Sequence, residues 1–276
     1  MHILGPCEVS YIRFDSKSSR SFDSIRFDVK DSIVCLNGGY EVNGTCTCVD
    51  GFVGSTCERL MTDCSEGFTY GYVDGIYNIQ PPYITTSFPA LCAMKYGGRT
   101  LMQYRHLPSE DFYRNWTDYR DGFGSLDSDF WLGLEKVYQI VRDRTFDLRL
   151  YMRLKNGTYY QHRFLNFTIS DEASGYTLYF DSAAPYSVDP LGDSLTTLKG
   201  SKFSTKDVDN DNWSNGSCAD LFESGFWFNS CADCNPNGRL LKPSDGKRTG
   251  AKSEVFWTND LGNDVPYRTR MWLVRQ

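Results

Sequence analysis

Three aspartates at alternate positions, Asp207, Asp209 and Asp211, are the residues whose type and spacing best suit a chemical role. Carboxylates at alternate positions of a turning backbone converge on one point, where calcium would take carboxylate, main-chain carbonyl and water oxygens. A solvated acidic turn is the alternative explanation of so short a motif. The triplet is, however, followed by Gly216 and by two cysteines that flank an aromatic run, in DVDNDNWSNGSCADLFESGFWFNSC (207–231). This combination favours a calcium-binding loop.

The composition indicates a folded chain with a substantial core. The 276 residues leave room for one large domain and a small one, and the 40% hydrophobic and 15% aromatic content excludes general disorder. A net charge of −6 gives no overall attraction to nucleic acid or to an anionic membrane surface. No apolar run approaches the length of about 18 residues that spans a membrane. We therefore expect neither a nucleic-acid partner nor a membrane span.

The cysteine content and the glycosylation signals indicate an oxidising, extracellular compartment. Ten cysteines are too many for a reducing compartment in the absence of metal sites. Asn-X-Ser/Thr sequons, which exceed the chance expectation, occur at Asn43, Asn115, Asn156, Asn166, Asn212 and Asn215. The N-terminus, MHILGPCEVSYIRF, is too polar for a signal peptide. We expect a secreted protein in a mature or truncated form, with an intracellular isoform as the alternative.

The hydrophobic pattern predicts an α+β fold for residues 64–276. Alternating apolar residues predict strands over 145–154 and 175–183. A helix is predicted over 109–119, with Ser109 as its N-cap. No internal repeat and no coiled-coil heptad pattern accompany these elements.

Several separate segments carry the motifs of one known family. They are the stretch between Cys64 and Cys92, DFYRNWTDYRDGFGSLDSDFWLGLE (111–135), GDSLTTLKGSKFSTKD (192–207), NPNGRLL (235–241) and TRMWLVR (269–275). Together with the acidic loop they resemble the fibrinogen-like domain over roughly 62–276. The resemblance implies an antiparallel central sheet with a loop-rich, calcium-binding subdomain.

A cysteine-rich segment precedes this region. CLNGGYEVNGTCTCVDGFVGSTCE (35–58) resembles an EGF-like module with four of the usual six cysteines, which implies the pairs Cys35–Cys46 and Cys48–Cys57. So small a module has almost no core and depends on its disulfides, and we interpret it as a spacer. The expected organisation is an N-terminal segment of unknown role, an EGF-like module and a fibrinogen-like domain, over 1–32, 33–58 and 62–276.

The resemblance also assigns roles within the acidic loop. It implies calcium ligation by the carboxylates of two aspartates and by two main-chain carbonyls, from Asp209, Asp211, Trp213 and Asn215. One additional residue in the loop leaves the carbonyl of Gly216 as an alternative to that of Asn215, whereas Asp207 is expected to orient the loop. A glycan on Asn212 would crowd the ion. We therefore expect glycosylation at the other five sequons, Asn43, Asn115, Asn156, Asn166 and Asn215.

The remaining cysteines divide into two implied disulfides and two leftover thiols. The family pattern implies Cys64–Cys92 and Cys218–Cys231. A zinc or redox C-x-x-C formed by Cys231 and Cys234 lacks the second ligand pair and the βαβ context that those sites need. Cys7 and Cys234 remain. We expect a Cys7–Cys7 disulfide dimer, with a Cys7–Cys234 intrachain bond as the competing arrangement.

The bridge Cys218–Cys231 also marks the expected ligand site. Lectin-like members of the family bind acetyl groups beside it, in an aromatic cage with a histidine after the second cysteine; here Ala232 occupies that position, and Ala251 and Asp264 replace cage tyrosines. These departures weaken binding of acetylated sugars but leave a pocket for another ligand. The candidate ligand-binding residues are Phe222, Trp227, Phe228, Cys231, Ala232 and Trp257.

Recognition, rather than catalysis, is the expected activity. H-E-x-x-H and G-x-S-x-G motifs are absent, so we do not expect an enzyme. The resemblance implies a secreted, calcium-dependent protein that binds a carbohydrate or protein ligand, as innate-immune lectin-like proteins do. The alternative is an extracellular-matrix or receptor-directed ligand for adhesion or signalling.

Overall fold

A computed structural model describes residues 33–185, 190–242, 249–261, 264 and 266–276. Residues 33–276 form one compact unit. The expectations for residues 1–32, including a Cys7–Cys7 bond, lie outside the described residues. Within the described parts of the chain, no helix is both long and apolar enough to cross a bilayer.

An antiparallel central sheet organises the fold, as the sequence predicted. Seven hydrogen-bonded strands form its main path. In spatial order they are β12 (Leu178–Tyr179), β11 (Tyr159–Ile169), β10 (Phe146–Leu154), β16 (Pro266–Arg275), β7 (Arg99–Arg105), β6 (Phe88–Ala93) and β5 (Gly75–Ile79). Strand β13 (Ser182–Pro185) pairs with β11, and β9 (Phe130–Trp131) pairs with both β7 and β8 (Phe123–Gly124).

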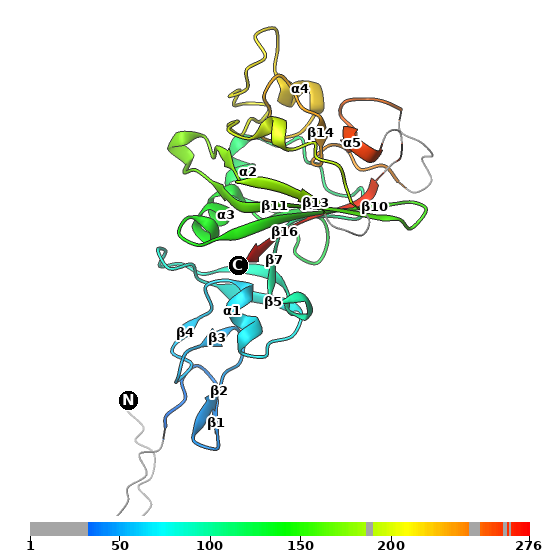
Figure 1. Ribbon diagram of the computed structural model, residues 1–276. Helices are drawn as coiled ribbons and strands as arrows, with labels where there is room; N and C mark the ends of the chain where they lie inside the picture. Colours follow the sequence, from blue (N-terminus) through cyan, green and yellow to red (C-terminus); the bar gives the residue numbers. More distant parts are fainter. Residues whose placement is uncertain (1–32, 186–189, 243–248, 262–263, 265) are drawn as a thin grey trace, which may run out of the picture. The chain divides into compact units, whose positions relative to one another are not determined.

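The C-terminal strand lies in the middle of this sheet (Figure 1). Strand β16 pairs with β10 on one side and with β7 on the other, so residues more than a hundred positions apart become neighbours. Along β10, Leu148, Leu150 and Met152 are buried, whereas the alternate residues Tyr151 and Arg153 are half-buried. Because side chains alternate across a strand, the sheet has an apolar face and a polar face.

Three helices support the sheet: α1 (Cys64–Thr69), α2 (Trp116–Asp121) and α3 (Leu134–Val141). Helix α3 buries Leu134, Val137, Ile140 and Val141, the apolar stripe expected of an amphipathic helix. The helix predicted over 109–119 is wrong in its start, because the helix begins at Trp116 and its N-cap is Asn115. Phe112 instead packs under the Arg105 guanidinium at 3.9 Å, and its burial holds this stretch out of the helix.

Aromatic rings fill the core between the sheet and the C-terminal loops. Trp227 lies 5.2 Å from Phe203 and 6.4 Å from Trp131, measured between ring centroids. Tyr119 packs 5.5 Å from Trp131 and donates its hydroxyl hydrogen to the carbonyl of Phe112. All of these rings are buried, so the aromatic-rich composition is used mainly for packing.

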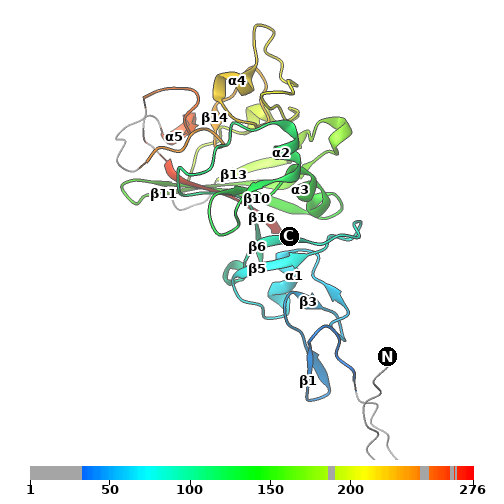
Figure 2. The same cartoon turned by 180° about the vertical axis from the view of Figure 1, so that it is seen from behind.

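The C-terminal third consists mostly of loops. Its short elements are α4 (Cys218–Phe222), β14 (Cys234–Asn235), β15 (Phe256–Trp257), α5 (Thr258–Leu261) and the 3-10 turn η3 (Thr196–Leu198). Two other 3-10 turns, η1 (Met94–Tyr96) and η2 (Glu172–Ser174), lie earlier in the chain. Figure 2 shows α4 and β14 on the side of the sheet away from β1 and β3. The strand predicted over 175–183 forms in part: positive φ angles at Gly175 and Tyr176 delay its start, and it is present as the short strands β12 and β13, which pair with β11 in one register.

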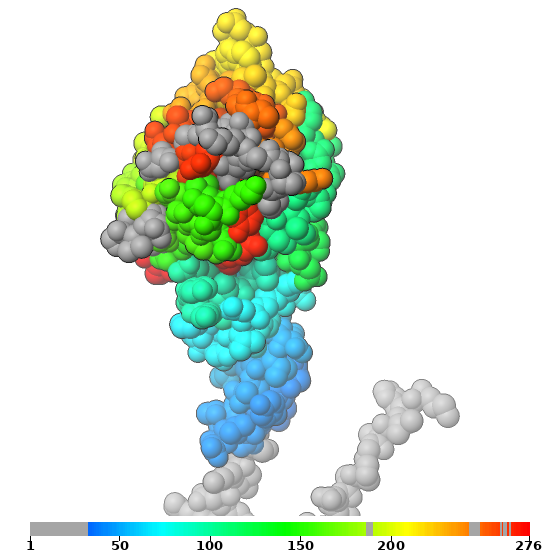
Figure 3. Space-filling view, turned by 90° about the vertical axis from the view of Figure 1, so that its right-hand side faces the viewer, coloured from blue at the N-terminus to red at the C-terminus, as the bar shows by residue number. Residues whose placement is uncertain are grey.

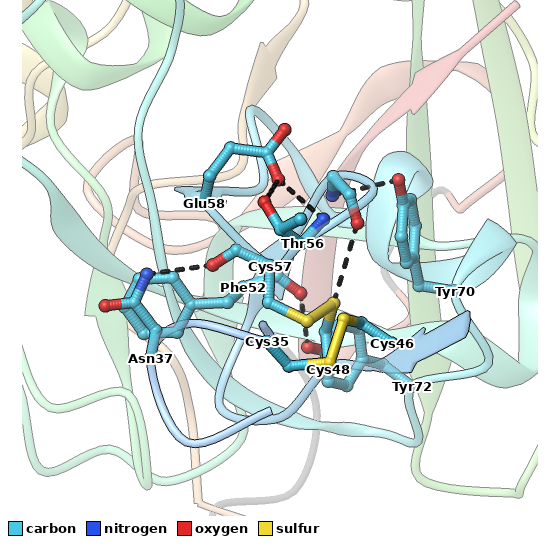
Figure 4. Close-up of a disulfide and its surroundings, with 11 residues drawn as sticks. Cys35, Asn37, Cys46, Cys48, Phe52, Thr56, Cys57, Glu58, Tyr70 and Tyr72 are labelled. Atoms are coloured by element: carbon cyan, nitrogen blue, oxygen red, sulfur yellow. Dashed lines mark hydrogen bonds between the residues drawn. A yellow bond between two sulfur atoms is a disulfide. The ribbon is translucent and has the colours of Figure 1, made fainter. Parts of the chain in front are cut away.

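The N-terminal cysteine-rich segment contains two small hairpins, β1 (Tyr40–Val42) with β2 (Thr45–Thr47), and β3 (Phe52–Val53) with β4 (Arg59–Leu60). Its disulfides are Cys35–Cys46 and Cys48–Cys57 (Figure 4). Two tyrosines join it to the region that follows: the Tyr72 hydroxyl donates to the Phe52 carbonyl at 2.6 Å, and the Tyr70 hydroxyl accepts from the Gly54 N–H at 3.0 Å.

Two further disulfides, Cys64–Cys92 and Cys218–Cys231, complete the set expected from the sequence. The first joins α1 to β6, and the second closes the segment that follows the acidic loop. Bridges of this kind stabilise a fold largely by restricting its unfolded state.

Candidate functional site

The acidic loop is tied to the sheet-covering helix α2. Asp207 Oδ1 accepts the backbone N–H of Trp116 at 2.8 Å and the Thr205 hydroxyl at 2.7 Å. Asn210 donates its side-chain amide to the Phe203 carbonyl at 2.8 Å. Asp207 thus has the orienting role expected for it, and its carboxylate fixes where the loop begins.

Asp209 and Asp211 lie close together in the loop. Asp209 Oδ1 accepts the backbone N–H of Asp211 at 3.1 Å. Asp211 in turn accepts the N–H of Trp213 through Oδ1 and the N–H of Cys218 through Oδ2, each at 2.8 Å. Burial raises the pKa of Asp211, and the neighbouring Asp209 carboxylate raises it further, although the two backbone N–H groups oppose this change. The loop therefore concentrates negative charge.

This arrangement fits a hard cation by its donor set. The described residues contain no group of three or more His, Cys, Asp or Glu side chains suited to a metal. The loop instead offers two carboxylates and the main-chain carbonyls of a turn, the mixed oxygen set that calcium accepts. Asp209 and Asp211, with the carbonyls of Trp213 and Asn215, would hold the ion.

A short helix and a disulfide close the loop on its C-terminal side. Ser217 caps α4, its hydroxyl accepting the N–H of Asp220 at 3.3 Å. Cys218 starts this helix and is bonded to Cys231, which follows the aromatic run. The backbone N–H of Asn212 donates to the Asn229 carbonyl at 2.7 Å. The acidic loop and the aromatic run are therefore fixed against each other.

The aromatic residues proposed as ligand contacts belong to the core. Phe222, Trp227, Phe228 and Trp257 are each no more than 1% exposed. Trp227 Nε1–H donates to the Tyr176 carbonyl at 2.7 Å, and Trp257 Nε1–H donates to the Gly192 carbonyl. The prediction that these four rings line a ligand site is wrong in this structure, because packing and indole hydrogen bonds use them fully.

The remaining candidate contacts, Cys231 and Ala232, are half-buried at the surface of the same segment. Ala251 is half-buried and Asp264 is exposed, and neither side chain carries an aromatic ring. No aromatic cage of the expected kind is therefore available from these three positions, Ala232, Ala251 and Asp264.

A polar cavity of about 270 Å³ lies near the end of α4. Arg105 is buried in its wall, and burial lowers its pKa to about 10. A hydrogen bond to Asp220 raises the pKa of Tyr113 to about 12. The cavity combines both signs of charge, because two arginines and three acidic residues are among its lining residues. The lining residues are Arg105, Pro108, Ser109, Glu110, Asp111, Phe112, Tyr113, Glu223, Asn237, Arg239 and Leu240.

The predicted glycosylation sites differ in accessibility. Asn43, Asn156, Asn166 and Asn215 are exposed, whereas Asn115 is half-buried and uses its side-chain oxygen to cap α2. Asn212, whose sequon was expected to be poorly occupied, is exposed and donates its side-chain amide to Asn229 Oδ1 at 2.8 Å. That hydrogen bond occupies the amide nitrogen to which a glycan would be attached.

Cys234 is the one cysteine without a disulfide among the described residues. It lies in β14 opposite Trp257 and is completely buried. Burial also raises the pKa of its thiol. A buried, protonated thiol is a poor nucleophile, which argues against the Cys7–Cys234 bond considered from the sequence.

A second surface, which the sequence pattern did not predict, lies on the polar face of the sheet. Arg99, Arg153, Arg268 and Arg270 gather there with several tyrosines. The available signal was the alternation of arginine with apolar residues in FDLRLYMRL (146–154) and YRTRMWLVR (267–275). Only the pairing of these two segments brings the arginines together.

Comparison with known proteins agrees with this geometry. Residues 60–272 match the family described as "Fibrinogen beta and gamma chains, C-terminal globular domain". Microfibril-associated glycoprotein 4 of Bos taurus is 36% identical over 195 residues, which cover 67% of this chain and 74% of that protein. Angiopoietin-4 of Bos taurus is 36% identical over 221 residues, which cover 79% of this chain and 43% of that protein.

Solved structures share the fold. The fibrinogen-like globe domain of human ANGPTL2 has a TM-score of 0.71 at 28% identity, covering 77% of this chain and 98% of that chain. Lamprey fibrin D-dimer complexed with the peptide ligand Gly-His-Arg-Pro-amide has a TM-score of 0.68 at 26% identity, covering 78% of this chain and 73% of that chain. The chain belongs to the family of the C-terminal globular domain of fibrinogen beta and gamma chains.

Proposed function

We propose that the protein is a secreted, non-enzymatic recognition protein whose fibrinogen-like domain binds an extracellular protein ligand in matrix adhesion or signalling. The observation that carries this choice is the burial of Phe222, Trp227, Phe228 and Trp257, which leaves no ring platform for an acetylated sugar. The named relatives include a microfibril-associated glycoprotein and an angiopoietin, and a peptide is the ligand in the lamprey fibrin complex.

The cavity near α4 is the proposed site of protein recognition. Its charges of both signs suit a peptide segment that carries complementary charges. Glu223 at its rim is exposed, whereas Asn237 and Arg105 in its wall are buried and therefore fixed in position. Arg105 Nη1 donates to the Gly238 carbonyl, and the buried Nε of the same side chain has no hydrogen-bond partner.

Catalysis has no support in the described histidines. His162 is buried, with Nδ1 at the Leu191 carbonyl. His106 pairs with Asp129 at 2.9 Å and stacks on Tyr104, an arrangement that orders a loop next to β7. Neither faces a nucleophilic side chain across a recorded hydrogen bond, and a catalytic base needs such a partner.

Residues 33–58 are proposed to be a spacer that resembles an EGF-like module with four of the usual six cysteines. Val34, Leu36, Tyr40 and Val42 are all exposed, so this segment has few buried apolar side chains of its own. Its two disulfides replace the missing core. A spacer of this kind would carry the fibrinogen-like domain away from whatever precedes it.

Calcium is proposed as the structural cofactor of the acidic loop. Calcium should raise the thermal midpoint, because the ion binds the folded loop and relieves repulsion between Asp209 and Asp211. At a concentration of about 100 times its Kd, the gain is about 2.7 kcal/mol. The measurement is a melting scan in calcium and in EDTA. Asp209→Asn with Asp211→Asn should abolish the response, whereas Asp127→Asn with Asp143→Asn, which removes exposed acids elsewhere, should preserve it.

A pH series in EDTA provides the second arm of this test. The folded pKa of Asp211 is raised, so its contribution to stability is present below the ordinary aspartate pKa of about 3.9 and is lost as pH rises through the raised value. Acidification in EDTA should therefore favour wild type relative to Asp211→Asn. An unchanged melting midpoint with calcium, or an equal response in the double variant, would contradict the calcium site.

Ligand class is tested with two probes. On a glycan array, with and without calcium, the protein should not bind N-acetylated glycans. On decellularised fibroblast matrix, retention should be lost after trypsin treatment of the matrix and should survive removal of N-glycans. Glu223→Lys should weaken retention about tenfold or more by reversing a charge at the cavity rim, and Asp127→Lys serves as the control.

Two outcomes would overturn this assignment. Calcium-dependent, micromolar binding to acetylated glycans would establish the lectin-like alternative. Retention that survives trypsin, or that Glu223→Lys and Asp127→Lys reduce equally, would show that the cavity does not select a protein ligand.

A further inference from the structure

A groove of about 430 Å³ opens on the polar face of the central sheet, separate from the acidic loop and from the cavity near α4. Four arginines and three tyrosines dominate its lining, and no lining residue is acidic. The lining residues are Tyr96, Arg99, Tyr151, Met152, Arg153, Tyr159, Gln161, Arg268, Arg270 and Trp272. In a chain with net charge −6, this is a local concentration of positive charge.

Strand pairing places these side chains in rows. On β10 and β16, Arg153 lies opposite Arg268 and Tyr151 lies opposite Arg270. On the neighbouring strand β11, Tyr159 lies opposite Arg153. Figure 3 shows the green surface of the β10–β11 region beside the red surface of β16. The rows therefore continue across three adjacent strands.

In the absence of a ligand, these rows of arginines destabilise the pairing of the strands. Like charges directly opposite one another on neighbouring strands destabilise the pairing, and Arg153 and Arg268 are such a pair. In the described part of the chain, no ion pair is recorded for Arg99, Arg153, Arg268 or Arg270. The Nε atoms of Arg153, Arg268 and Arg270 are also buried without a hydrogen-bond partner. An anionic ligand would supply the compensating charge to these guanidinium groups.

Tyrosines hold the guanidinium groups in place before any ligand arrives. The Arg270 guanidinium lies 4.7 Å from the Tyr104 ring centroid and donates to the Tyr104 hydroxyl at 3.1 Å. Arg99 Nη1 donates to the Tyr151 hydroxyl at 2.8 Å, and Arg153 lies 4.7 Å from the Tyr159 ring. Stacked guanidinium groups lose less conformational freedom on binding than free ones, which favours affinity.

We propose that this groove binds a sulfated glycosaminoglycan. Arginine forks match the paired oxygens of sulfate and carboxylate groups, and the tyrosine and tryptophan rings provide apolar surface for sugar rings. The arginines lie on three adjacent strands, β10, β16 and β7, which suits a polymer with repeated anionic groups. The extracellular relatives favour such a polymer over nucleic acid.

An anionic peptide fits the groove less well. A peptide that adds to a sheet takes main-chain hydrogen bonds from a free edge. Strand β16 is paired on both sides, so its backbone is already used where the arginines are densest. Recognition at this surface therefore has to come from side chains, the means by which a charged polysaccharide is bound.

Heparin is the probe for this inference. The full chain should bind heparin-agarose at about 0.15 M NaCl, near physiological ionic strength, and elute at higher salt. Arg268→Gln with Arg270→Gln should weaken the Kd for heparin about tenfold or more, because two charge-assisted contacts are lost. Lys199→Gln with Lys202→Gln removes the same charge from exposed lysines outside the groove and should leave the Kd nearly unchanged.

Stability separates a binding role from a structural one. Arg268→Gln removes the repulsion across Arg153 and Arg268, so its melting midpoint should equal or exceed that of wild type. Arg268→Lys with Arg270→Lys, which keeps the charge but not the fork, should bind heparin with intermediate affinity.

Four results would overturn the proposal. The first is a wild-type chain that does not bind heparin at about 0.15 M NaCl. The second is a groove variant and a lysine control that lose equal affinity. The third is binding to a sulfotyrosine peptide but not to heparin, which would assign the groove to a protein partner. Equal binding to heparin and to N- and O-desulfated heparin would likewise remove sulfate as the recognised group.

Discussion

Replacing Trp227 by alanine is expected to lower the free energy of unfolding by about 3–5 kcal/mol. The indole is completely buried between Phe203 and Trp131, and its removal leaves a cavity that the sheet-supported core cannot close. The Tyr176 carbonyl also loses the indole N–H that donates to it at 2.7 Å. Denaturant unfolding with the disulfides intact measures the change.

Two further variants test the interpretation of Trp227 as a core residue. Trp227→Phe retains a ring but not the N–H, so we expect a smaller loss, of about 1–3 kcal/mol for the unsatisfied carbonyl. Tyr83→Ala, at a side chain 61% exposed, should cost far less. If Trp227→Ala left stability near that of wild type, the ring would not be a core residue and its original assignment to a ligand site would return.

Replacing Asp63 by alanine is expected to cost a similar amount, about 3–5 kcal/mol, for a different reason. Asp63 is 1% exposed and accepts from Arg144 at 2.9 Å and from Arg275 at 2.8 Å. Its other oxygen caps α1 by accepting the N–H groups of Ser65 and Glu66. This carboxylate joins the start of the fibrinogen-like domain to its last strand, so its loss leaves two arginines without their buried partner.

Two further variants separate the contributions of the Asp63 charge and of its helix cap to the free energy of unfolding. Asp63→Asn retains a capping oxygen but removes the charge, so the difference between the two variants reports the cap, about 1 kcal/mol. Asp143→Ala breaks the exposed 3.0 Å pair with Arg142 and should cost less than about 1 kcal/mol. Equal losses in Asp63→Ala and Asp143→Ala would show that burial of the Asp63 carboxylate adds nothing.

The two arginine partners of Asp63 illustrate what the sequence does not reveal. Asp63 and Arg275 are 212 positions apart, and only the placement of β16 near α1 brings them together. Local pattern contains no information about such a pair. The same holds for the groove, where Arg153 and Arg268 become opposite neighbours through the β10–β16 register.

The predicted helix and strand boundaries were incorrect where tertiary packing or the backbone conformation competed with local preference. Ser109 is an acceptable N-cap, yet burial of Phe112 under Arg105 delays the helix until Asn115. The alternation in 175–183 suits a strand, but positive φ angles at Gly175 and Tyr176 turn the chain there, so the strand starts only at β12. In 145–154 the alternation was correct, because both faces of β10 have partners consistent with it.

The sequence motifs were sufficient to identify the family, and through that resemblance they predicted the antiparallel sheet, the four disulfides and the position of the acidic loop, because such motifs are local in the chain. Only the tertiary structure decided which aromatic rings are buried and which surface gathers charge. The local sequence around a tryptophan is the same whether its ring packs in the core or contacts a ligand. Burial of the ring depends on elements that are distant in the chain. Likewise, alternating arginines form a surface only when two remote strands pair in register.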